Sequence, residues 1–568
     1  MNNRPTSSQS TESTDTSPSL PQDVFDVLVV GGGINGAGIA RDLSGRGCKV
    51  LLCEKDDLAS HTSSSSTKLI HGGLRYLEHG DFSLVRKALA EREVLLRSAP
   101  HIMWPLRFVM PHDPTSGSAR PAWMIRLGLF LYDHLAKRET LAGSTTIDLR
   151  QHPCGKPLKS TFTKGFVYSD GWVDDARLVV LNAMDAAERG ATVLTRWRCV
   201  DAKRDTAQWR VQLKSSCGET RFVTARVLVN AAGPWAAQFL SEHAHIADRK
   251  SLRLVKGSHI VVPKIFDHDH AYIFQNADKR ITFAIPYETD FTLIGTTDVE
   301  HHGTVGNAHI DAAETAYLCE QASRYFEREI MPEHVVWSYS GVRPLLDDES
   351  GDHASAVTRE YSLDLDWPAP MPPRIGRVDS GLPDEAPARS DRPAALLTVW
   401  GGKLTTYRKL AEEAGDLLAA PLNTAMSRGA WTNGAVLPGG DLNAGIDASQ
   451  LARSDAASDF SRFVQSVETQ HPELPKSLCH RLARAYGTRV EVLLARGLNA
   501  EVAPGVFEAE LDYLRRHEWA RTADDVLWRR SKLGLHLNDA QRTAVVDWCT
   551  AHWPDIAAPM AMTAAPGT

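Results

Sequence analysis

The strongest constraint on the fold is a glycine-rich turn near the start of the chain, between a predicted strand at residues 24–30 and a predicted helix at 35–47. Gly31, Gly33 and Gly36 have the spacing G-x-G-x-x-G, which permits a tight turn and a close approach of the backbone to a pyrophosphate. The N-terminus of the following helix would offer free N–H groups and a partial positive charge to that anion. This strand, turn and helix predict a dinucleotide-binding unit.

An acidic residue follows at the position where such units bind a ribose. The second predicted strand, residues 49–53, leads directly to Glu54, whose carboxylate can accept hydrogen bonds from ribose hydroxyls. The same carboxylate would repel a 2′-phosphate, so the pattern disfavours NADP. Both strands are continuous apolar runs, which is typical of the buried parallel strands of an α/β fold.

Two further glycine turns distinguish FAD from NAD. Gly233 lies in a turn after a predicted strand at 227–230, and this turn resembles the returning strand of FAD-dependent amine and hydroxy-acid oxidoreductases. Gly402 and Lys403 lie in a third turn, after a predicted strand at 396–400, where a helix begins. A helix N-terminus and an ammonium group stabilise negative charge on a reduced flavin ring. Three turns in this order predict FAD.

Length and composition bound the remaining possibilities. A chain of 568 residues is too long for one core and predicts two or three packed units. The formal charge of −7 gives no indication of a nucleic-acid partner. The eight cysteines include no CxxC pair, which favours reduced thiols over disulfides or a zinc site. No HExxH motif or carboxylate cluster suggests a metal, and we expect none.

The chain divides by composition into three parts. Residues 1–23 are rich in Ser, Thr and Pro and predict a disordered tail without the features of a signal peptide. Residues 24–424 alternate strands and helices, interrupted by a proline-rich loop at 366–393, and predict an FAD-binding domain interleaved with a substrate-capping domain. Residues 425–568 are predicted to form a helical C-terminal domain. The longest uncharged apolar stretch is too short to cross a bilayer.

Several ordered stretches, taken together, resemble the FAD-dependent glycerol-3-phosphate dehydrogenases of the aerobic respiratory type. The stretches are GGGINGAGIARD (31–42), TSSSSTKLIHGGLRYLE (62–78), RPAWMIRLGLFLYDHL (120–135), YSDGWVDDARLV (168–179), KGSHIVVP (256–263), IGTTDVE (294–300), YSGVRPL (339–345), GGKLTTYRKLAE (401–412) and WRRSKLGLHL (528–537). The resemblance implies an α/β fold with a Rossmann-like FAD-binding domain, an interleaved antiparallel-sheet substrate domain and an α-helical C-terminal domain. It also implies oxidation of sn-glycerol 3-phosphate to dihydroxyacetone phosphate by hydride transfer to FAD.

The resemblance also implies which residues bind the cofactor. These are Gly31, Gly33, Asn35, Gly36, Glu54, Ser63, Ser64, Lys68, Leu69, Gly233, Gly402, Lys403, Leu404 and Thr405. Most of them lie in the three glycine turns, and Ser63 to Lys68 look like a loop that runs past the flavin.

Substrate residues are expected in four of the quoted stretches and at Arg359, which lies outside them. The resemblance implies that Arg75 and Tyr76 face the substrate and that Arg343 and Arg359 bind its phosphate. The planar guanidinium of arginine is suited to contact two phosphate oxygens at once. A general base must take the C2 hydroxyl proton. His259 is our candidate on the resemblance. His71 and Tyr76 are its rivals, and Thr296 and Asp298 either orient the substrate or cap a turn.

The electron acceptor follows from the resemblance alone. Respiratory members reduce a membrane quinone from the cytoplasmic side of the inner membrane, to which they bind peripherally. The apolar stretch 120–138, with basic ends, fits either a helix lying on anionic lipid or a core helix. Arg529, Arg530 and Lys532 form a second basic candidate for the lipid surface. The oligomeric state is left open, with a homodimer among the options.

Three alternatives remain open from the sequence. The first is an oxygen-using glycerol-3-phosphate oxidase, and the second is an amine or amino-acid oxidase of the same fold. The third is a flavin-binding protein without enzymatic activity. Substrate range, peroxide formation and reduction of the bound flavin by substrate would distinguish them.

Overall fold

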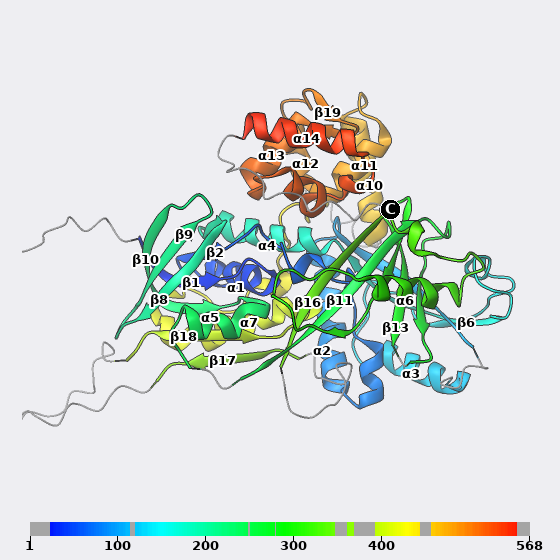
Figure 1. The fold of residues 1–568 in the computed structure, drawn as a ribbon, viewed down its shortest axis with the longest axis horizontal. Helices are drawn as coiled ribbons and strands as arrows, with labels where there is room; N and C mark the ends of the chain where they lie inside the picture. Colours follow the sequence, from blue (N-terminus) through cyan, green and yellow to red (C-terminus); the bar gives the residue numbers. More distant parts are fainter. Residues whose placement is uncertain are drawn as a thin grey trace, which may run out of the picture.

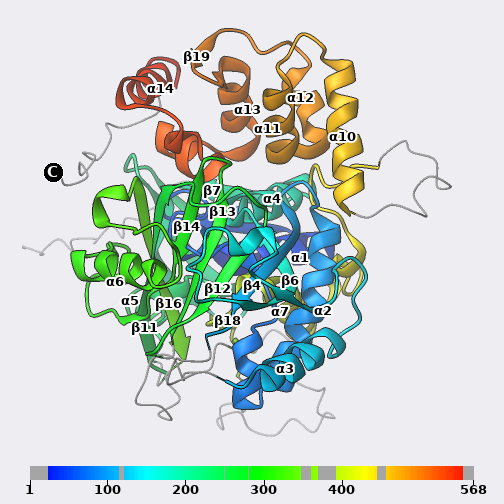
Figure 2. The same ribbon diagram turned by 90° about the vertical axis from the view of Figure 1, so that its right-hand side faces the viewer.

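The structure is a computed structural model that describes residues 23–113, 120–247, 250–278, 280–346, 360–368, 392–443 and 456–553. Two large sheets form the body of the molecule, and a helical C-terminal region, residues 456–553, lies above them (Figure 1). The view turned by 90° shows the same arrangement, with the orange and red helices covering one end of the sheets (Figure 2). The predicted α/β class with an added antiparallel sheet and a helical C-terminal part is confirmed.

The first sheet carries the nucleotide-binding turns. Its strand order is β17-β18-β10-β1-β2-β7, with an antiparallel ribbon of β8 and β9 attached to β10. The strands are β1 (Asp23–Val30), β2 (Val50–Glu54), β7 (Thr192–Thr195), β8 (Trp197–Arg204), β9 (Trp209–Ser215), β10 (Thr220–Asn230), β17 (Ser362–Asp366) and β18 (Ala395–Trp400). From β18 to β7 neighbouring strands are parallel, and their apolar residues are buried. The central strand β1 therefore presents its carboxyl end beside those of β2 and β10.

Three helices cover one face of this sheet. They are α1 (Ile34–Gly45), α4 (Asp175–Glu188) and α7 (Tyr407–Leu417), and α1 packs against the other two. Small residues make the close packing possible: Gly38 of α1 lies against the ring of Tyr407. Because α4 and α7 come from distant parts of the sequence, this layer joins three chain segments around the first glycine turn.

The second sheet is largely antiparallel and carries two of the predicted substrate residues, His259 and Arg343. Its order is β15-β11-β14-β13-β12-β4-β6-β3, with β16 paired to β11 and β5 paired to β6. The strands are β3 (Leu69–Ile70), β4 (Met103–Pro111), β5 (Thr145–Asp148), β6 (Lys164–Val173), β11 (Leu252–Pro263), β12 (Ala271–Gln275), β13 (Ile281–Tyr287), β14 (Phe291–Gly295), β15 (Val299–Glu300) and β16 (Trp337–Leu346). The long antiparallel register of β11 and β16 sets His259 opposite Tyr339 and Val255 opposite Arg343. Helices α2 (Phe82–Ser98), α3 (Ala122–His134) and α6 (Ala312–Ser323) flank this sheet.

The C-terminal region is mainly helical, as predicted, but it also contains a small hairpin. Its elements are α10 (Ala456–Gln470), α11 (Lys476–Tyr486), α12 (Val490–Leu494), β19 (Glu501–Ala503), β20 (Val506–Phe507), α13 (Glu508–Glu518), the π-helix η11 (Asp525–Arg530) and α14 (Asp539–His552). They enclose an apolar core of their own. The domain boundary at residue 424 stays a prediction.

Two sequence predictions fall partly outside the described residues. The tail at 1–23 is described only at Asp23, where β1 begins, and the proline-rich loop at 366–393 is described only at its two ends. In the described ranges, no helix has the length and apolar character needed to cross a membrane.

The prediction of a basic lipid-binding surface at Arg529, Arg530 and Lys532 is wrong. Arg530 and Lys532 are buried. Arg529 and Arg530 both pair with the carboxylate of Asp57 at 2.7 Å, inside the contact between the C-terminal region and the first sheet. Lys532 donates a hydrogen bond to the carbonyl of Trp528 at 2.7 Å. A run of cations in a sequence does not show whether its partners are lipids or distant carboxylates.

Candidate functional site

A deep cleft opens at the carboxyl ends of β1, β2, β10 and β18. Its walls come from the three glycine turns, the loop at residues 59–63, and parts of β8, α5 (Ala236–Glu242) and β16. Its empty volume, with the open mouth counted, is about 1260 Å³. Its lining extends from Glu54 past the first and second glycine turns to Gly402, so the cleft suits an extended ligand.

The first turn can only be built from glycine. Gly31 has a φ of +112°, and a Cβ there would collide with the carbonyl of Ala231 in the second glycine turn. A Cβ on Gly36 would collide with the carbonyl of Gly31. The N-cap residue of α1, Gly33, has no side chain to cap the helix. Gly33, Ile34 and Asn35 all line the cleft, so the helix N-terminus faces it. Ser63, a predicted cofactor residue, accepts a hydrogen bond from the N–H of Ile34 at 3.0 Å and lies at this N-terminus.

The predicted ribose acid is fixed at the end of β2. Glu54 accepts hydrogen bonds from the N–H of Gly32 at 2.6 Å and from the N–H of Asp56 at 2.8 Å. Burial raises the pKa of Glu54. Each carboxylate oxygen keeps a further lone pair, which ribose hydroxyls can use. The geometry therefore fits the nucleoside end of a dinucleotide.

Asn35 connects the first glycine turn to the third. Its amide nitrogen donates to the carbonyl of Gly401 at 3.1 Å. Its Oδ1 is buried and finds no hydrogen-bond partner within the described part of the chain. Gly402, with a φ of +102°, lies against the Asn35 amide. Because buried polar atoms are rarely left unpaired, Asn35 is poised to accept a hydrogen bond from a bound ligand.

The third turn meets the stretch that contains the predicted substrate residues. Lys403 lies 4.0 Å from the ring centroid of Tyr76. Thr405 accepts a hydrogen bond from the N–H of His71 at 3.2 Å. Leu404 and Thr405 belong to a short 3-10 helix, η7 (Leu404–Thr406), that leads into α7. Residues 71–76 therefore lie against the third glycine turn, of which Gly401 and Gly402 line the cleft, whereas Lys403, Leu404 and Thr405 are not among the lining residues. Gly233, with a φ of +57°, lines the cleft from the second turn.

Ser64, Lys68 and Leu69 are not among the lining residues, unlike Ser63. Lys68 is buried, pairs with Asp175 at 2.7 Å and donates to the carbonyl of Ser64 at 3.1 Å. Leu69 lies in β3 and contributes to an apolar core. These contacts fix the shape of the loop, and a direct contact of the three residues with the cofactor stays a prediction.

His259, the candidate base, is buried in the middle of β11. Its Nε2 is hydrogen-bonded to the hydroxyl of Thr67 at 2.9 Å, and its ring stacks on Tyr339 at 4.8 Å between centroids. Within the described residues Nδ1 has no partner. Burial, and then the positive charges of Arg343 and Lys68, hold the pKa of His259 well below its usual range. The imidazole is therefore neutral near pH 7.

The Tyr339 ring continues this stack toward the C-terminal region. Tyr339 contacts Trp337 at 5.1 Å, and Trp337 stacks on Trp528 of η11 at 5.0 Å with an angle of 19° between the planes. We call these four rings, His259, Tyr339, Trp337 and Trp528, the aromatic column.

Arg343, the first predicted phosphate ligand, is held in place by the residues whose role the sequence left open. Its guanidinium pairs with Asp298 at 2.6 Å and donates to the hydroxyl of Thr296 at 3.0 Å. The flat face lies over Gly257, where any side chain would collide with it. The Arg343 side chain is 22% exposed, so it is fixed but still reachable. Thr296 and Asp298 position Arg343.

The structure does not describe the side chains of the other two predicted arginines, Arg75 and Arg359. Arg75 lies in the 3-10 helix η2 (Leu74–His79), of which the structure describes the backbone at this position, and Arg359 lies outside the described residues. Their grouping with Arg343 stays a prediction.

Sequence reasoning missed part of the cleft wall. His61, Trp197 and Trp235 line the cleft, and the rings of His61 and Trp235 meet edge to face at 4.7 Å. Trp235 ends the second glycine turn, two residues after Gly233, whereas His61 and Trp197 stand in no motif of their own. Tyr339 stands in the stretch YSGVRPL that also contains Arg343, so the sequence carried a signal for it.

One group of described residues has metal-ligand chemistry. The ligand atoms of Cys154, His268 and His270 lie within 4.8 Å of one another, whereas a tetrahedral zinc ion would hold its ligand atoms about 3.5 Å apart. His268 is also hydrogen-bonded through Nε2 to Tyr272 at 2.8 Å. None of the three lines the cleft, and we assign them no metal.

Comparisons with known proteins agree with this geometry. The family described as FAD dependent oxidoreductase matches residues 26–363, and the C-terminal domain of alpha-glycerophosphate oxidase matches residues 430–550. The chain is 48% identical to a glycerol-3-phosphate dehydrogenase of Pseudomonas aeruginosa, over 94% of this chain and 97% of the relative. It is 47% identical to a D-erythritol 1-phosphate dehydrogenase of Brucella abortus, over 92% and 97%.

A solved structure supports the cofactor. The glycerol-3-phosphate dehydrogenase from Bacillus halodurans, complexed with FAD, aligns with a TM-score of 0.70 at 26% identity, covering 94% of this chain and 91% of that one. The cleft, with its three glycine turns, Glu54 and the unpaired oxygen of Asn35, fits FAD. The protein is an FAD-dependent oxidoreductase, and the chain belongs to the family of FAD-dependent glycerol-3-phosphate dehydrogenases.

Proposed function

We propose that the protein oxidises the C2 hydroxyl of sn-glycerol 3-phosphate to give dihydroxyacetone phosphate and passes the electrons to a membrane quinone. The observation that carries this proposal is the 48% identity, over 97% of its length, to a relative named for that dehydrogenase activity. FAD supplies the two-electron acceptor for the oxidation.

Arg343 would bind the phosphate of the substrate. Asp298 and Thr296 hold the guanidinium, so its planar fork keeps a set direction. A planar guanidinium matches two phosphate oxygens, and the charge-assisted hydrogen bonds orient the rest of the substrate.

His259 would take the proton from the C2 hydroxyl. In the tautomer whose Nε2–H donates to Thr67, the lone pair on Nδ1 is available for that proton. The charge of Arg343 lowers the pKa of this imidazole in the free protein. A phosphate dianion paired with Arg343 would offset that charge, so the substrate would make His259 more basic as it binds.

Lys403 and the start of α7 would place positive charge beside Tyr76, next to the third glycine turn. The ammonium group lies over Tyr76, and the helix dipole points in the same sense. Both contributions favour negative charge developing there during the reaction. Arg75 and Tyr76 would complete the substrate side, as the resemblance implies.

Membrane association would occur through α3. Its Ile125, Leu129 and Tyr132 are buried, while five large apolar side chains on the same helix are exposed. The exposed residues are Trp123, Met124, Leu127, Phe130 and Leu131, of which Trp123 is 65% exposed. We call them the α3 apolar face. Such a face suits peripheral binding to a lipid surface, where a quinone is reached. The cytoplasmic side of the inner membrane and a homodimeric state stay predictions of the resemblance.

The oxidation of D-erythritol 1-phosphate is a second candidate, because a relative named for that activity is 47% identical over nearly its whole length. Both substrates are phosphorylated polyols with a secondary hydroxyl. The test is anaerobic addition of each compound to the FAD-loaded protein while the visible flavin absorbance is recorded. The proposal is supported if glycerol 3-phosphate bleaches the flavin and has a higher kcat/KM than D-erythritol 1-phosphate. Bleaching by D-erythritol 1-phosphate alone supports the second candidate, and no bleaching by either contradicts both.

The acceptor is tested separately. Substrate-dependent reduction of a quinone analogue without stoichiometric peroxide would support the quinone. Peroxide equal to the substrate consumed would instead identify the oxygen-using alternative.

A further inference from the structure

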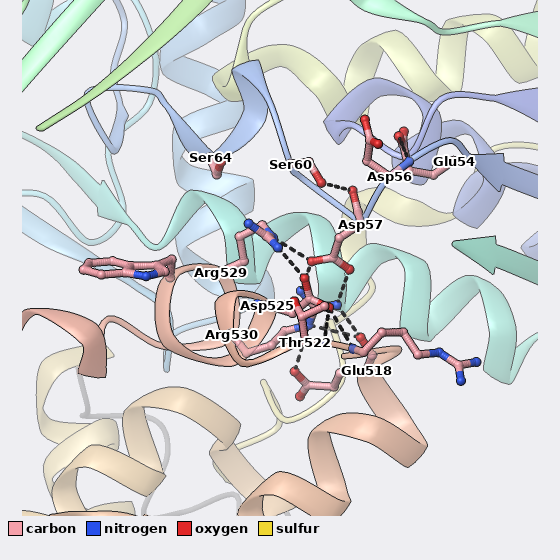
Figure 3. Close-up of polar contacts among 12 residues, drawn as sticks. Glu54, Asp56, Asp57, Ser60, Ser64, Glu518, Thr522, Asp525, Arg529 and Arg530 are labelled. Atoms are coloured by element: carbon pink, nitrogen blue, oxygen red, sulfur yellow. Dashed lines mark hydrogen bonds and ion pairs between the residues drawn. The ribbon is translucent and has the colours of Figure 1, made fainter. Parts of the chain in front are cut away.

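A six-residue π-helix of the C-terminal region, η11, lies against the loop that follows β2. Arg530 pairs in a bidentate manner with the carboxylate of Asp57, with two N–O distances of 2.7 Å. Arg529 pairs with the same carboxylate through Nε at 2.7 Å. Figure 3 shows both guanidinium groups directed at Asp57. The side chains of Asp57 and Arg530 are buried, so water does not weaken these ion pairs.

The loop that carries Asp57 also carries the groups that face the cofactor cleft. It begins at Glu54, whose carboxylate accepts from the N–H of Asp56. The Ser60 hydroxyl donates to the carbonyl of Asp57 at 2.6 Å, and the N–H of Ala59 donates to the carbonyl of Gly32 at 3.2 Å. The position of Asp57 therefore influences the path of the chain from Glu54 to the N-terminus of α1.

The π-helix is itself held by further buried charges. Asp525 accepts from the N–H of Arg521 at 2.7 Å and pairs with Arg196, which precedes β8, at 2.8 Å. It also pairs with Arg529, and these arginines hold the pKa of Asp525 well below its usual range. Acidic and basic side chains thus alternate across the contact between the C-terminal region and the first sheet, in the order Asp57, Arg529, Asp525 and Arg196. A π-helix is rare and often marks a functional position.

Two parts of a protein can pack together without a buried network of ion pairs. Apolar residues could join the same surfaces without the cost of removing three charges from water, whereas a bidentate pair fixes the direction of both partners. The direction fixed here is that of the loop bearing Glu54. Asp57, Arg529 and Arg530 do not themselves line the cleft.

We propose that Asp57, Arg529 and Arg530 are positioning residues for FAD. The C-terminal region holds the loop at residues 54–63 in the conformation that binds the nucleotide, and FAD affinity depends on an ion pair outside the cofactor cleft. The C-terminal region would accordingly contribute to cofactor retention without touching the cofactor.

The test measures FAD affinity and stability independently of substrate. Apoprotein of the wild type and of Asp57→Asn, Arg529→Gln and Arg530→Gln is titrated with FAD, and the quenching of flavin fluorescence gives Kd. The unfolding temperature of each apoprotein is measured in parallel. Glu510→Gln is the matched control, because the buried carboxylate of Glu510 pairs with the partly exposed Arg481, at 2.7 and 2.8 Å, within the C-terminal region itself.

We expect Asp57→Asn and Arg530→Gln to raise the Kd for FAD at least tenfold, with Glu510→Gln within twofold of the wild type. Arg529, which is partly exposed, provides the milder variant if Arg530→Gln does not fold, and its Kd should rise at least threefold. Asp57→Glu, which keeps the charge, should recover part of the affinity. The proposal is overturned if the folded variants bind FAD within twofold of the wild type, or if Glu510→Gln weakens FAD binding equally.

Discussion

The side-chain amide of Asn35 donates a hydrogen bond to the backbone carbonyl of Gly401 at 3.1 Å, although 366 residues separate the two. The bond fixes the third glycine turn relative to the first. We predict that Asn35→Ala raises the Kd for FAD about tenfold, because a hydrogen bond and a ligand acceptor worth about 1–2 kcal/mol are lost together. Asn443→Ala, which removes a bond to Asp459 in another part of the chain, is the control and should leave Kd unchanged.

Arg343→Ala should lower kcat/KM for the phosphorylated substrate at least about 30-fold, equivalent to ~2 kcal/mol, since a charge-assisted contact to phosphate is removed. Steady-state kinetics measures the effect. Arg253→Ala, which breaks a pair with Glu300 on the same sheet, should change kcat/KM less than threefold. An Arg343→Ala enzyme as efficient as the wild type would remove this residue from the site.

The pH profile of kcat/KM should fall on the acid side below pH ~6.5, the usual pKa of histidine. The pKa of His259 is lowered by burial, Arg343 and Lys68, so the base is lost only when acid protonates it below that pH. In His259→Gln this acid limb should disappear together with most of the activity. His268→Gln, at a histidine distant from the cleft wall, should keep the limb. A limb that persists in His259→Gln would reassign the base.

Acid should destabilise the protein through His101. Burial, with the nearby Arg177 and Arg484, lowers the pKa of this histidine to about 3. The unfolded chain therefore takes up the proton first, and stability falls as the pH drops from ~6.5 toward 3. At pH 5 this group should cost about 2 kcal/mol relative to pH 7.5. Urea unfolding at the two pH values measures the difference in unfolding free energy. In His101→Gln this difference should be smaller by about 2 kcal/mol. An equal loss of stability in the wild type and the variant would show that His101 is not responsible.

Membrane association should depend on the α3 apolar face. Leu127→Glu combined with Phe130→Glu should release the protein from anionic vesicles in a flotation assay, because two carboxylates cannot enter the lipid interface without a large cost. Phe222→Glu, at an exposed apolar residue on β10, is the control and should leave binding intact. Equal binding of all three proteins would exclude α3 as the lipid contact.

Local patterns were enough to predict the elements that hold the nucleotide. The glycine turns, Glu54 and the continuous apolar strands each depend on neighbours in the sequence, and the structure places them in one cleft. The stretch with Arg343 was also recognisable. Its partner Asp298 was expected either to orient the substrate or to cap a turn. The pairing with Arg343 was not predicted, because it requires β16 to lie beside β11.

The errors concern side chains whose partners are distant. The sequence predicted a basic surface at Arg529 and Arg530, but their partner Asp57 lies more than 470 residues earlier in the sequence. A sequence pattern gives the charge of a segment but not the fold that supplies the opposite charge. The same limit applies to Asn35, whose partner Gly401 belongs to a different motif.

The aromatic column has a consequence for how the molecule can move. Two of its three contacts are stacked, His259 on Tyr339 and Trp337 on Trp528, and Trp337 meets Tyr339 at an angle of 43°. Because interiors are close-packed, a tilt of Trp528 would open a void beside Trp337. The four rings therefore connect the C-terminal helices to the imidazole by direct contact.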